Sequence, residues 1–270
     1  MDYKTDNQTL NIGNGRSCGP VLVRGTQSWR EIFGPAGQPD APALDEFTVS
    51  ETEEILFGLA VAVEQRDRHT AGHCERLAWV AVAMGVAMGL ARASLLALYR
   101  GGYLHDVGKV GISDSILFKP GKLTAEEWIV MRSHSARGEE ICRPMKSLAP
   151  VLPIIRHHHE RWDGSGYPDG LRGDQIPMLA RVMQIADIYD ALTSPRPYKP
   201  AFSDARALQI IEEETQCGWR DPELVQLFLR LHKDVISRME GPLGGMQASL
   251  SNLLQMVAQG QDGLGRLRVD

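Results

Sequence analysis

Residues 100–109, RGGYLHDVGK, end a helical pattern in an adjacent histidine and aspartate, His105 and Asp106. Neighbouring residues on a regular helix point about 100° apart, so the two side chains would not normally reach one target. Glycines at positions 101, 102 and 108 predict that the helix ends here, where a distorted backbone can bring both side chains to one metal cluster. A His-Asp pair alone is common by chance, so its meaning depends on the surrounding residues.

Further histidines and an aspartate lie on other predicted helices. Seven of the eight histidines fall between residues 69 and 159. His73 lies on an earlier helix and His134 on a later one, while Asp187 stands on an otherwise apolar helical face. Burying an aspartate on such a face is costly unless it is paired or bound to a metal. Imidazole and carboxylate together suit iron, manganese, cobalt, nickel or zinc, so we expect a transition-metal site.

Apolar residues recur at helical spacing along most of the chain, without any clear two-residue alternation. The pattern predicts helices near residues 50–63, 70–90, 93–105, 124–134, 150–160, 178–193 and 205–216, and a last one after Asp221. Capping boxes mark two of the starts, at residues 50–53 and 124–127. Asp221 followed by Pro222 is an N-cap with proline at the first helical position. We therefore expect an all-α fold.

The composition is that of an ordinary soluble globular chain, with 43% hydrophobic and 23% charged residues among 270. No apolar run is long enough for a membrane-spanning helix, and the polar N-terminus argues against a secretory signal. A net charge of −5 provides no basic field for duplex nucleic acid. The four scattered cysteines lack disulfide or zinc-ribbon spacing and favour a cytoplasmic location.

The two ends of the chain differ in composition from the middle. Residues 1–45 are rich in glycine, proline and short polar residues and are predicted to form a mostly disordered arm. The ordered domain is expected over residues 46–238. A Gly-Pro-Leu-Gly-Gly break then opens a C-terminal tail, residues 239–270, in which residues 246–257 could form a short amphipathic helix.

Five motifs resemble those of the HD-GYP family, a branch of the HD phosphohydrolases that contains cyclic di-GMP phosphodiesterases. The motifs are long, ordered and specific, and the resemblance covers about residues 50–235. They are residues 66–73 (RDRHTAGH), 104–109 (LHDVGK), 119–124 (KPGKLT), 158–168 (HHERWDGSGYP) and 186–199 (ADIYDALTSPRPYK). The resemblance implies an HD-domain helical bundle with the HD-GYP extension.

By this resemblance, seven residues match metal-ligand positions of the family. They are His73, His105, Asp106, His134, His158, His159 and Asp187. Asp106 would bridge two divalent transition-metal ions, with iron or manganese favoured, and these would activate water for in-line attack on a phosphodiester. Asp106 and Lys109 are the implied catalytic residues, because Lys109 matches a lysine that stabilises the phosphate charge. His157 matches no ligand position and is assigned to structure, and His232 is expected at the surface.

The resemblance also implies substrate contacts. Gly166, Tyr167 and Pro168 belong to the loop that names the family, here called the GYP loop (residues 164–168). Its glycines let the backbone approach a ligand closely, and its tyrosine could stack on guanine or contact the phosphodiester ring. Arg196 and Lys199 match positions that hold substrate phosphates.

His69 departs from the family pattern. It stands four residues before His73, one helical turn away on the same face. Most relatives carry an aromatic residue there, and those described as binding three metals carry a glutamate. A histidine could complete a third metal site or lie beside a two-metal site. We favour two metal ions, with His69 near the rim.

The leading hypothesis is a phosphodiesterase that hydrolyses cyclic di-GMP to linear pGpG in bacterial signalling, and the sequence leaves open whether GMP is the final product. The first alternative is another cyclic dinucleotide such as cyclic GMP-AMP, since the GYP loop does not exclude it. A catalytically silent binding module would have lost ligands, whereas every matching ligand and Lys109 are present. A nucleoside triphosphate hydrolase of the wider superfamily would not need the GYP loop. A homodimer or a signalling-protein partner stays open.

Overall fold

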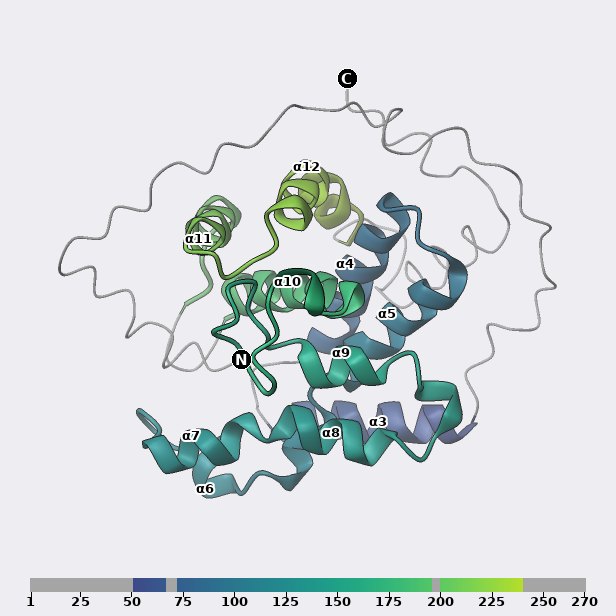
Figure 1. Ribbon diagram of the computed structural model, residues 1–270, viewed down its shortest axis with the longest axis vertical. Helices are drawn as coiled ribbons and strands as arrows, with labels where there is room; N and C mark the ends of the chain where they lie inside the picture. Colours follow the sequence, from purple (N-terminus) through teal and green to yellow (C-terminus); the bar gives the residue numbers. More distant parts are fainter. Residues whose placement is uncertain (1–50, 67–71, 196–199, 240–270) are drawn as a thin grey trace.

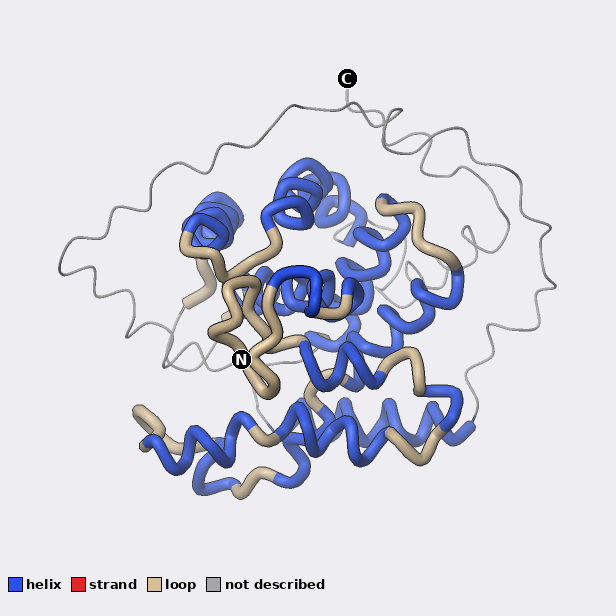
Figure 2. Tube along the Cα trace, in the orientation of Figure 1, coloured by secondary structure: helices blue, strands red, loops and turns tan. Residues whose placement is uncertain are grey.

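A computed structural model describes residues 51–66, 72–195 and 200–239 of the chain. Within these ranges every regular element is a helix, and Figure 2 shows helices joined by loops. This confirms the all-α prediction. The predicted arm at 1–45 and nearly all of the tail at 239–270 lie outside the described residues, as do His69, Arg196 and Lys199.

The helices follow one another along the chain, and the long segment between α9 and α10 carries the GYP loop (Figure 1). They are α3 (Glu51–Arg66), α4 (His73–Ala87), α5 (Arg92–Leu104), α6 (Asp114–Leu117), α7 (Ala125–Arg132), α8 (His134–Cys142), α9 (Leu152–His157), α10 (Met178–Thr193), α11 (Asp204–Gln216) and α12 (Pro222–Met239). Short 3-10 helices lie at Val107–Gly111, Lys146–Leu148 and Gly173–Gln175.

Helix α10 lies at the centre of the fold. Every residue from 180 to 192 is buried, and α10 contacts α4, α5, α9, α11 and α12. A helix enclosed on all sides is expected to be apolar all round. The polar residues that α10 nevertheless carries must therefore find partners inside the protein. They are Arg181, Gln184, Asp187 and Asp190.

The core joins α10 to the helices around it. One fully buried side chain from each of five helices shows this arrangement. These side chains are Leu77 of α4, Leu98 of α5, Ile154 of α9, Ile185 of α10 and Phe228 of α12. Burying a side chain of this size stabilises the fold by about 1.5–3 kcal/mol. The packing holds the ends of α4, α5 and α9 beside the middle of α10.

One predicted helix is interrupted in the structure. The helix expected at 124–134 ends at Arg132, and a new helix, α8, begins at His134. The predicted capping box is present, since Thr124 accepts from the Glu127 N–H. At the other end Ser133 donates its hydroxyl to the Val130 carbonyl at 2.6 Å. A serine side chain that bonds to a preceding carbonyl competes with the helix, and the break makes His134 the first residue of α8.

His232, which was expected at the surface, is buried. It is 6% exposed and lies beside the rings of Tyr189 and Phe228. Helix α12 packs against α4 and α10, and His232 follows Phe228 by four residues, so both point to the same side. The expectation was wrong because the packed face of α12, rather than the residue type, decides the burial of this histidine.

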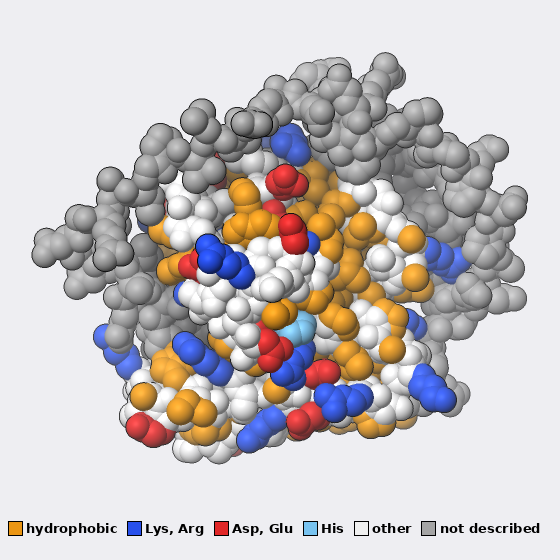
Figure 3. All heavy atoms as spheres, in the orientation of Figure 1, with side chains coloured by type: hydrophobic (Ala, Val, Ile, Leu, Met, Phe, Trp, Pro, Cys, Tyr) orange, Lys and Arg blue, Asp and Glu red, His pale blue; other side chains and the backbone are white. Residues whose placement is uncertain are grey.

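The surface of the described residues carries charges of both signs. In Figure 3, Lys and Arg side chains alternate with Asp and Glu along the edge that α6, α7 and α8 form in Figure 1. Among the described residues, no helix combines the length and the apolar character that crossing a membrane requires.

Candidate metal centre

The fold buries six of the seven predicted ligand residues and leaves the seventh, Asp106, half-buried. His73 begins α4, His105 and Asp106 follow α5, His134 begins α8, His158 and His159 follow α9, and Asp187 lies in the middle of α10. The five histidines are at most 7% exposed and Asp187 is 2% exposed. Residues from five separate segments thus meet around one buried point.

The His-Asp pair lies where α5 ends, as the flanking glycines predicted. The helix stops at Leu104, and Asp106 has φ −102° and ψ 6°. These angles lie in the sparsely populated bridge region. The distortion turns both side chains toward the same centre, because His105 Nε2 lies 3.3 Å from Asp106 Oδ2.

Gly108 lets α8 come close to this turn. A Cβ atom at position 108 would collide with the backbone of His134 and of Gly138, so only glycine permits the contact. Helix α8 packs against the 3-10 helix Val107–Gly111. His134 therefore reaches the His-Asp pair, and its Nε2 lies 3.2 Å from Asp106 Oδ1.

Asp106 belongs to two groups of side chains that could each hold a metal ion. One group is His73, His105 and Asp106, and the other is Asp106, His134, His158 and His159; within each group the candidate ligand atoms lie within 4.8 Å of one another. Asp187 adjoins the first group, with Oδ1 3.7 Å from His73 Nε2. A carboxylate shared by two such groups is what a bridge between two metal ions requires.

Five buried ligand atoms at this centre make no hydrogen bond among the described residues, although three of the Nε2 atoms lie 3.2–3.8 Å from an oxygen of Asp106. They are His105 Nε2, His134 Nε2, His158 Nε2, His159 Nε2 and Asp106 Oδ1. Each such atom costs about 1–3 kcal/mol if it stays unsatisfied, so five together indicate a ligand. Imidazole nitrogen and carboxylate oxygen are donors that iron, manganese and zinc accept. The residues therefore fit the metal ions that the family implies.

Backbone carbonyls orient three of the imidazoles. The Nδ1 atoms of His105, His134 and His158 lie 3.1, 2.8 and 2.8 Å from the carbonyl oxygens of Gly102, Met131 and Ile155. A neutral imidazole that donates through Nδ1 has an unprotonated Nε2. In all three residues that Nε2 faces Asp106, so the rings are already turned for metal binding.

A carboxylate orients His73 instead, that of Asp190, which stands in the motif at 186–199 but had been given no role. Asp190 Oδ2 lies 2.6 Å from His73 Nδ1, and Arg76 forms an ion pair with the same carboxylate, its Nη2 3.1 Å from Oδ2. Burial opposes ionisation, but His73 and Arg76 hold the pKa of Asp190 below its usual range. The sequence did contain a signal for Asp190: it follows Asp187 by three residues on a buried helix, so both side chains lie on the same side of that helix.

Ionisable groups at the centre shift one another's pKa. Burial opposes ionisation of Asp106, but Lys109 and His105 hold its pKa well below the usual range, and Lys109 Nζ lies 2.6 Å from Asp106 Oδ2. Burial lowers the pKa of His158 to about 4. Burial, together with His158 and His134, brings the pKa of His159 well below its usual range. Both histidines are therefore neutral near pH 7, which is the form that binds metal.

The GYP loop lies beside the second ligand group. Tyr167 stacks on His159, with ring centroids 4.7 Å apart and 28° between the planes. Gly166 packs against the backbone of Glu160 and Arg161, where a Cβ atom would collide. Pro168 follows and is exposed. The structure thus brings these three predicted substrate residues next to the candidate ligands.

Arg132 is a further charged residue near the centre that no motif had indicated. Its guanidinium carbon lies 5.1 Å from the Tyr167 ring centroid and 5.5 Å from that of Trp128. Arg132 is exposed, so it presents a cation at the edge of the GYP loop. In the sequence it is indistinguishable from other arginines on helix surfaces, because its partner Tyr167 is distant along the chain.

The helical fold and the buried histidine–aspartate centre are those of an HD domain. The HD domain family matches residues 59–224, which is more than half of the chain, and the chain belongs to this family. Within it, the resemblance to HD-GYP cyclic dinucleotide phosphodiesterases is confirmed by the curated relatives.

Two of these relatives illustrate the similarity. The 3'3'-cGAMP-specific phosphodiesterase 2 of Vibrio cholerae is 44% identical over 182 residues, which cover 66% of this chain and 34% of that protein. A cyclic di-GMP phosphodiesterase of Thermotoga maritima is 39% identical over 186 residues, which cover 67% of this chain and 50% of that protein. The chain thus spans only a third to a half of the length of these relatives.

A solved structure has the same fold. The crystal structure of a cyclic GMP-AMP specific phosphodiesterase from V. cholerae matches 76% of this chain and 54% of its own, with a TM-score of 0.56 and 24% sequence identity. At this level of identity the likeness concerns the fold alone.

Proposed function

We propose that the protein is a metal-dependent phosphodiesterase that hydrolyses cyclic di-GMP to linear pGpG, and product analysis decides whether hydrolysis continues to GMP. The observation that carries this proposal is the pair of ligand groups sharing Asp106, with five buried ligand atoms that make no hydrogen bond among the described residues. Divalent ions held by these two groups would supply activation of water and neutralisation of phosphate charge.

The seven predicted ligand residues hold the ions in this proposal. Asp106 belongs to both groups and would serve both ions. Lys109, whose Nζ lies 2.6 Å from Asp106 Oδ2, presents its positive charge beside the place where the phosphate would bind. That charge is of most use in the transition state, where the phosphate carries more negative charge than in the ground state.

Tyr167 and Arg132 form the described part of the substrate side. The Tyr167 ring is held against His159, and the Arg132 guanidinium lies over the same tyrosine. A guanidinium can pair with a phosphate or stack on a base. We infer that Arg196 and Lys199, which lie outside the described residues, add the remaining phosphate contacts, because they match the family's phosphate-binding positions.

Cyclic GMP-AMP is the second candidate substrate. The observation in its favour is the 44% identity to a 3'3'-cGAMP-specific phosphodiesterase, against 41% and 39% for two cyclic di-GMP phosphodiesterases. The two substrates share the phosphodiester ring and differ in one base, so the metal centre cannot discriminate between them. Discrimination would fall on groups that face the base, such as Tyr167 and Arg132.

The test is turnover of both cyclic dinucleotides by protein loaded with Mn²⁺ or Fe²⁺, with the products separated by chromatography. We expect pGpG from cyclic di-GMP and a higher kcat/KM for it than for cyclic GMP-AMP. A higher kcat/KM for cyclic GMP-AMP would reverse the order of the two substrates. No product from either substrate, with fully metal-loaded protein, would contradict the proposed enzyme.

We further propose two ions per chain, iron or manganese, with His69 at the rim of the site. The described residues support two groups that share Asp106. Metal analysis of anaerobically purified protein should therefore give about two ions per chain, and His69→Ala should leave this value unchanged. A value near three that falls to two in the variant would make His69 a ligand.

A further inference from the structure

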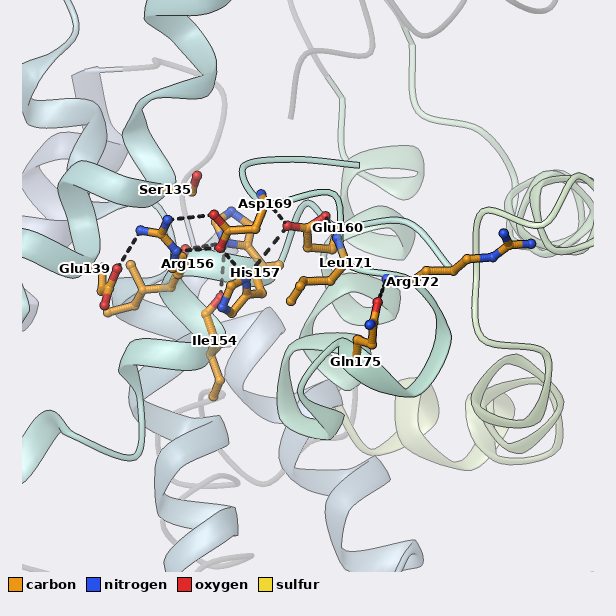
Figure 4. A network of polar contacts seen from close by, with 12 residues as sticks. Ser135, Glu139, Ile154, Arg156, His157, Glu160, Asp169, Leu171, Arg172 and Gln175 are labelled. Atoms are coloured by element: carbon orange, nitrogen blue, oxygen red, sulfur yellow. Dashed lines mark hydrogen bonds and ion pairs between the residues drawn. The ribbon is translucent and has the colours of Figure 1, made fainter. Parts of the chain in front are cut away.

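A second polar cluster adjoins the metal centre at the exit of the GYP loop (Figure 4). Arg156 is at its middle. Its Nε and Nη2 each lie 2.7 Å from an oxygen of Asp169, and its Nη1 lies 2.8 Å from Glu139 Oε2. The guanidinium thus uses all three nitrogens on two carboxylates, which is a forked geometry that a lysine cannot reproduce.

The three members of this cluster belong to three segments of the metal centre. Glu139 lies on α8, Arg156 on α9, and Asp169 directly after the GYP loop. The same segments carry the candidate ligand His134, the candidate ligands His158 and His159, and the substrate residue Tyr167. One side chain therefore holds together the three parts of the chain that must keep their relative positions for a substrate to bind.

Glu160 holds the loop exit from the inside. Its fully buried carboxylate accepts from the backbone N–H groups of Asp169 at 2.7 Å and Leu171 at 3.1 Å. Gln184 of α10 donates its side-chain amide to the Glu160 carbonyl. Glu160 follows His159 directly, so these bonds attach the loop exit to the backbone of the ligand histidines.

His157, Glu160 and Asp169 lie close enough together to form a third group of ligand atoms. Both oxygens of Asp169 are, however, bonded to Arg156, and both oxygens of Glu160 accept backbone N–H groups. A cation here would have to replace the guanidinium. His157 lies beside the cluster, its Nδ1 3.5 Å from Asp169 Oδ2, and its structural role stays a prediction.

We propose that Arg156 is a positioning residue that sets the place of Tyr167 relative to the ligand histidines by holding Asp169 against Glu139. Tyr167 lies two residues before Asp169 and stacks on His159. When the loop exit is released, the tyrosine ring loses its fixed place on the imidazole while the ligand set stays intact. The kinetic consequence rests on the proposed phosphodiesterase function; the structural consequence does not.

The test compares Arg156→Gln, Arg156→Lys and Asp169→Asn in the full chain loaded with Mn²⁺. Arg156→Gln should raise KM for the hydrolysed cyclic dinucleotide about tenfold, with a smaller change in kcat and unchanged Mn²⁺ content. Arg156→Lys should recover part of the loss, because it keeps the charge without the fork. Asp169→Asn should raise KM as much as Arg156→Gln does. The double variant should have a KM no higher than either single variant, because the contact between Arg156 and Asp169 is lost in all three.

Arg206→Gln is the matched control. Arg206 forms an exposed ion pair with Glu213 at 3.0 Å within α11, and its loss should leave KM unchanged. Asp169→Asn keeps the test decisive if Arg156→Gln does not fold, since the Asp169 side chain is 34% exposed and its loss disturbs no core packing. A KM for Asp169→Asn equal to that of the control would overturn the proposal.

Hydrogen exchange separates this proposal from the proposed function. Backbone amides of residues 164–171 should exchange about tenfold faster in Arg156→Gln than in Arg206→Gln, whether or not any cyclic dinucleotide is hydrolysed. Unchanged exchange would overturn the positioning role. If the protein hydrolyses neither substrate but exchange is faster in Arg156→Gln, the positioning role is supported and only the proposed phosphodiesterase function is contradicted.

Discussion

The two halves of the candidate metal centre are built in different ways. On the side formed by α5, α8 and α9, backbone carbonyl oxygens orient three imidazoles through their Nδ1 atoms. On the side formed by α4 and α10, side chains do this work. Asp190 orients His73 and is itself held by Arg76, while Asp187 faces the other nitrogen of His73.

The difference shows which half a single substitution can change. A carbonyl belongs to the backbone, so its hydrogen bond survives most substitutions of the residue that carries it. The hydrogen bond between Asp190 and His73 disappears when one side chain is replaced. On the side formed by α5, α8 and α9, we therefore expect substitutions of the residues that supply the carbonyls to leave metal affinity unchanged. On the side formed by α4 and α10, substitutions of α10 side chains should change it.

Asp106→Ala should have the largest effect because both ligand groups share this residue. We expect metal content near zero and turnover below about a thousandth of the original, since neither ligand group stays complete. Metal analysis and product chromatography measure the two effects, and circular dichroism confirms that the helices remain. A variant that keeps one tightly bound ion would show that one ligand group binds its ion without Asp106.

Lys109→Ala should have the next largest effect on turnover, and metal ions should stay bound in both ligand groups. The ammonium contacts Asp106 without being a ligand, so metal content should stay unchanged. Turnover should fall about 10²–10³-fold, with a smaller change in KM, because the charge acts mainly on the transition state. A variant in which only KM changes would assign Lys109 to substrate binding instead.

The backbone-held half also predicts a pH dependence for chelator-treated protein. Burial lowers the pKa of His158 to about 4, whereas an unfolded histidine titrates near 6.5. As the pH falls from 6.5 to 4, His158 takes up a proton in the unfolded chain but not in the folded protein. Its contribution to the free energy of unfolding, which is fully present above pH 6.5, is therefore lost, and the loss is about 3 kcal/mol. Urea unfolding at several pH values should show the slope, and His158→Gln should reduce it; equal slopes would contradict the assignment.

Asp190→Asn should have the smallest effect and is the most direct test of the comparison. The amide keeps the shape of the carboxylate but loses the charge that Arg76 and His73 share. Metal affinity should fall about tenfold while saturating metal restores most of the turnover. Asp174→Asn is the control, because Asp174 is exposed and lies outside the centre. Equal affinities in the two variants would show that the α4–α10 half does not depend on its side chains.

The sequence by itself determined the helical class and the residue types of the metal centre. Helical spacing and capping involve residues three or four positions apart, so α10 was predicted at its observed bounds, 178–193. The end of α5 at the His-Asp pair was predicted in the same way, from glycines close along the chain. The five family motifs supplied the candidate ligands. Histidine and aspartate side chains in an apolar interior must be paired, hydrogen-bonded or bound to a metal ion.

Only the tertiary structure decided how these residues are held. Asp190 and His73 are 117 residues apart in the sequence, and Arg156 joins Glu139 to Asp169 across two loops. The burial of His232 likewise depends on which face of α12 packs against its neighbours. Local spacing shows which side of a helix is apolar, but it does not show which other helix covers that side. The partners of buried polar residues therefore become visible only when the helices are packed together.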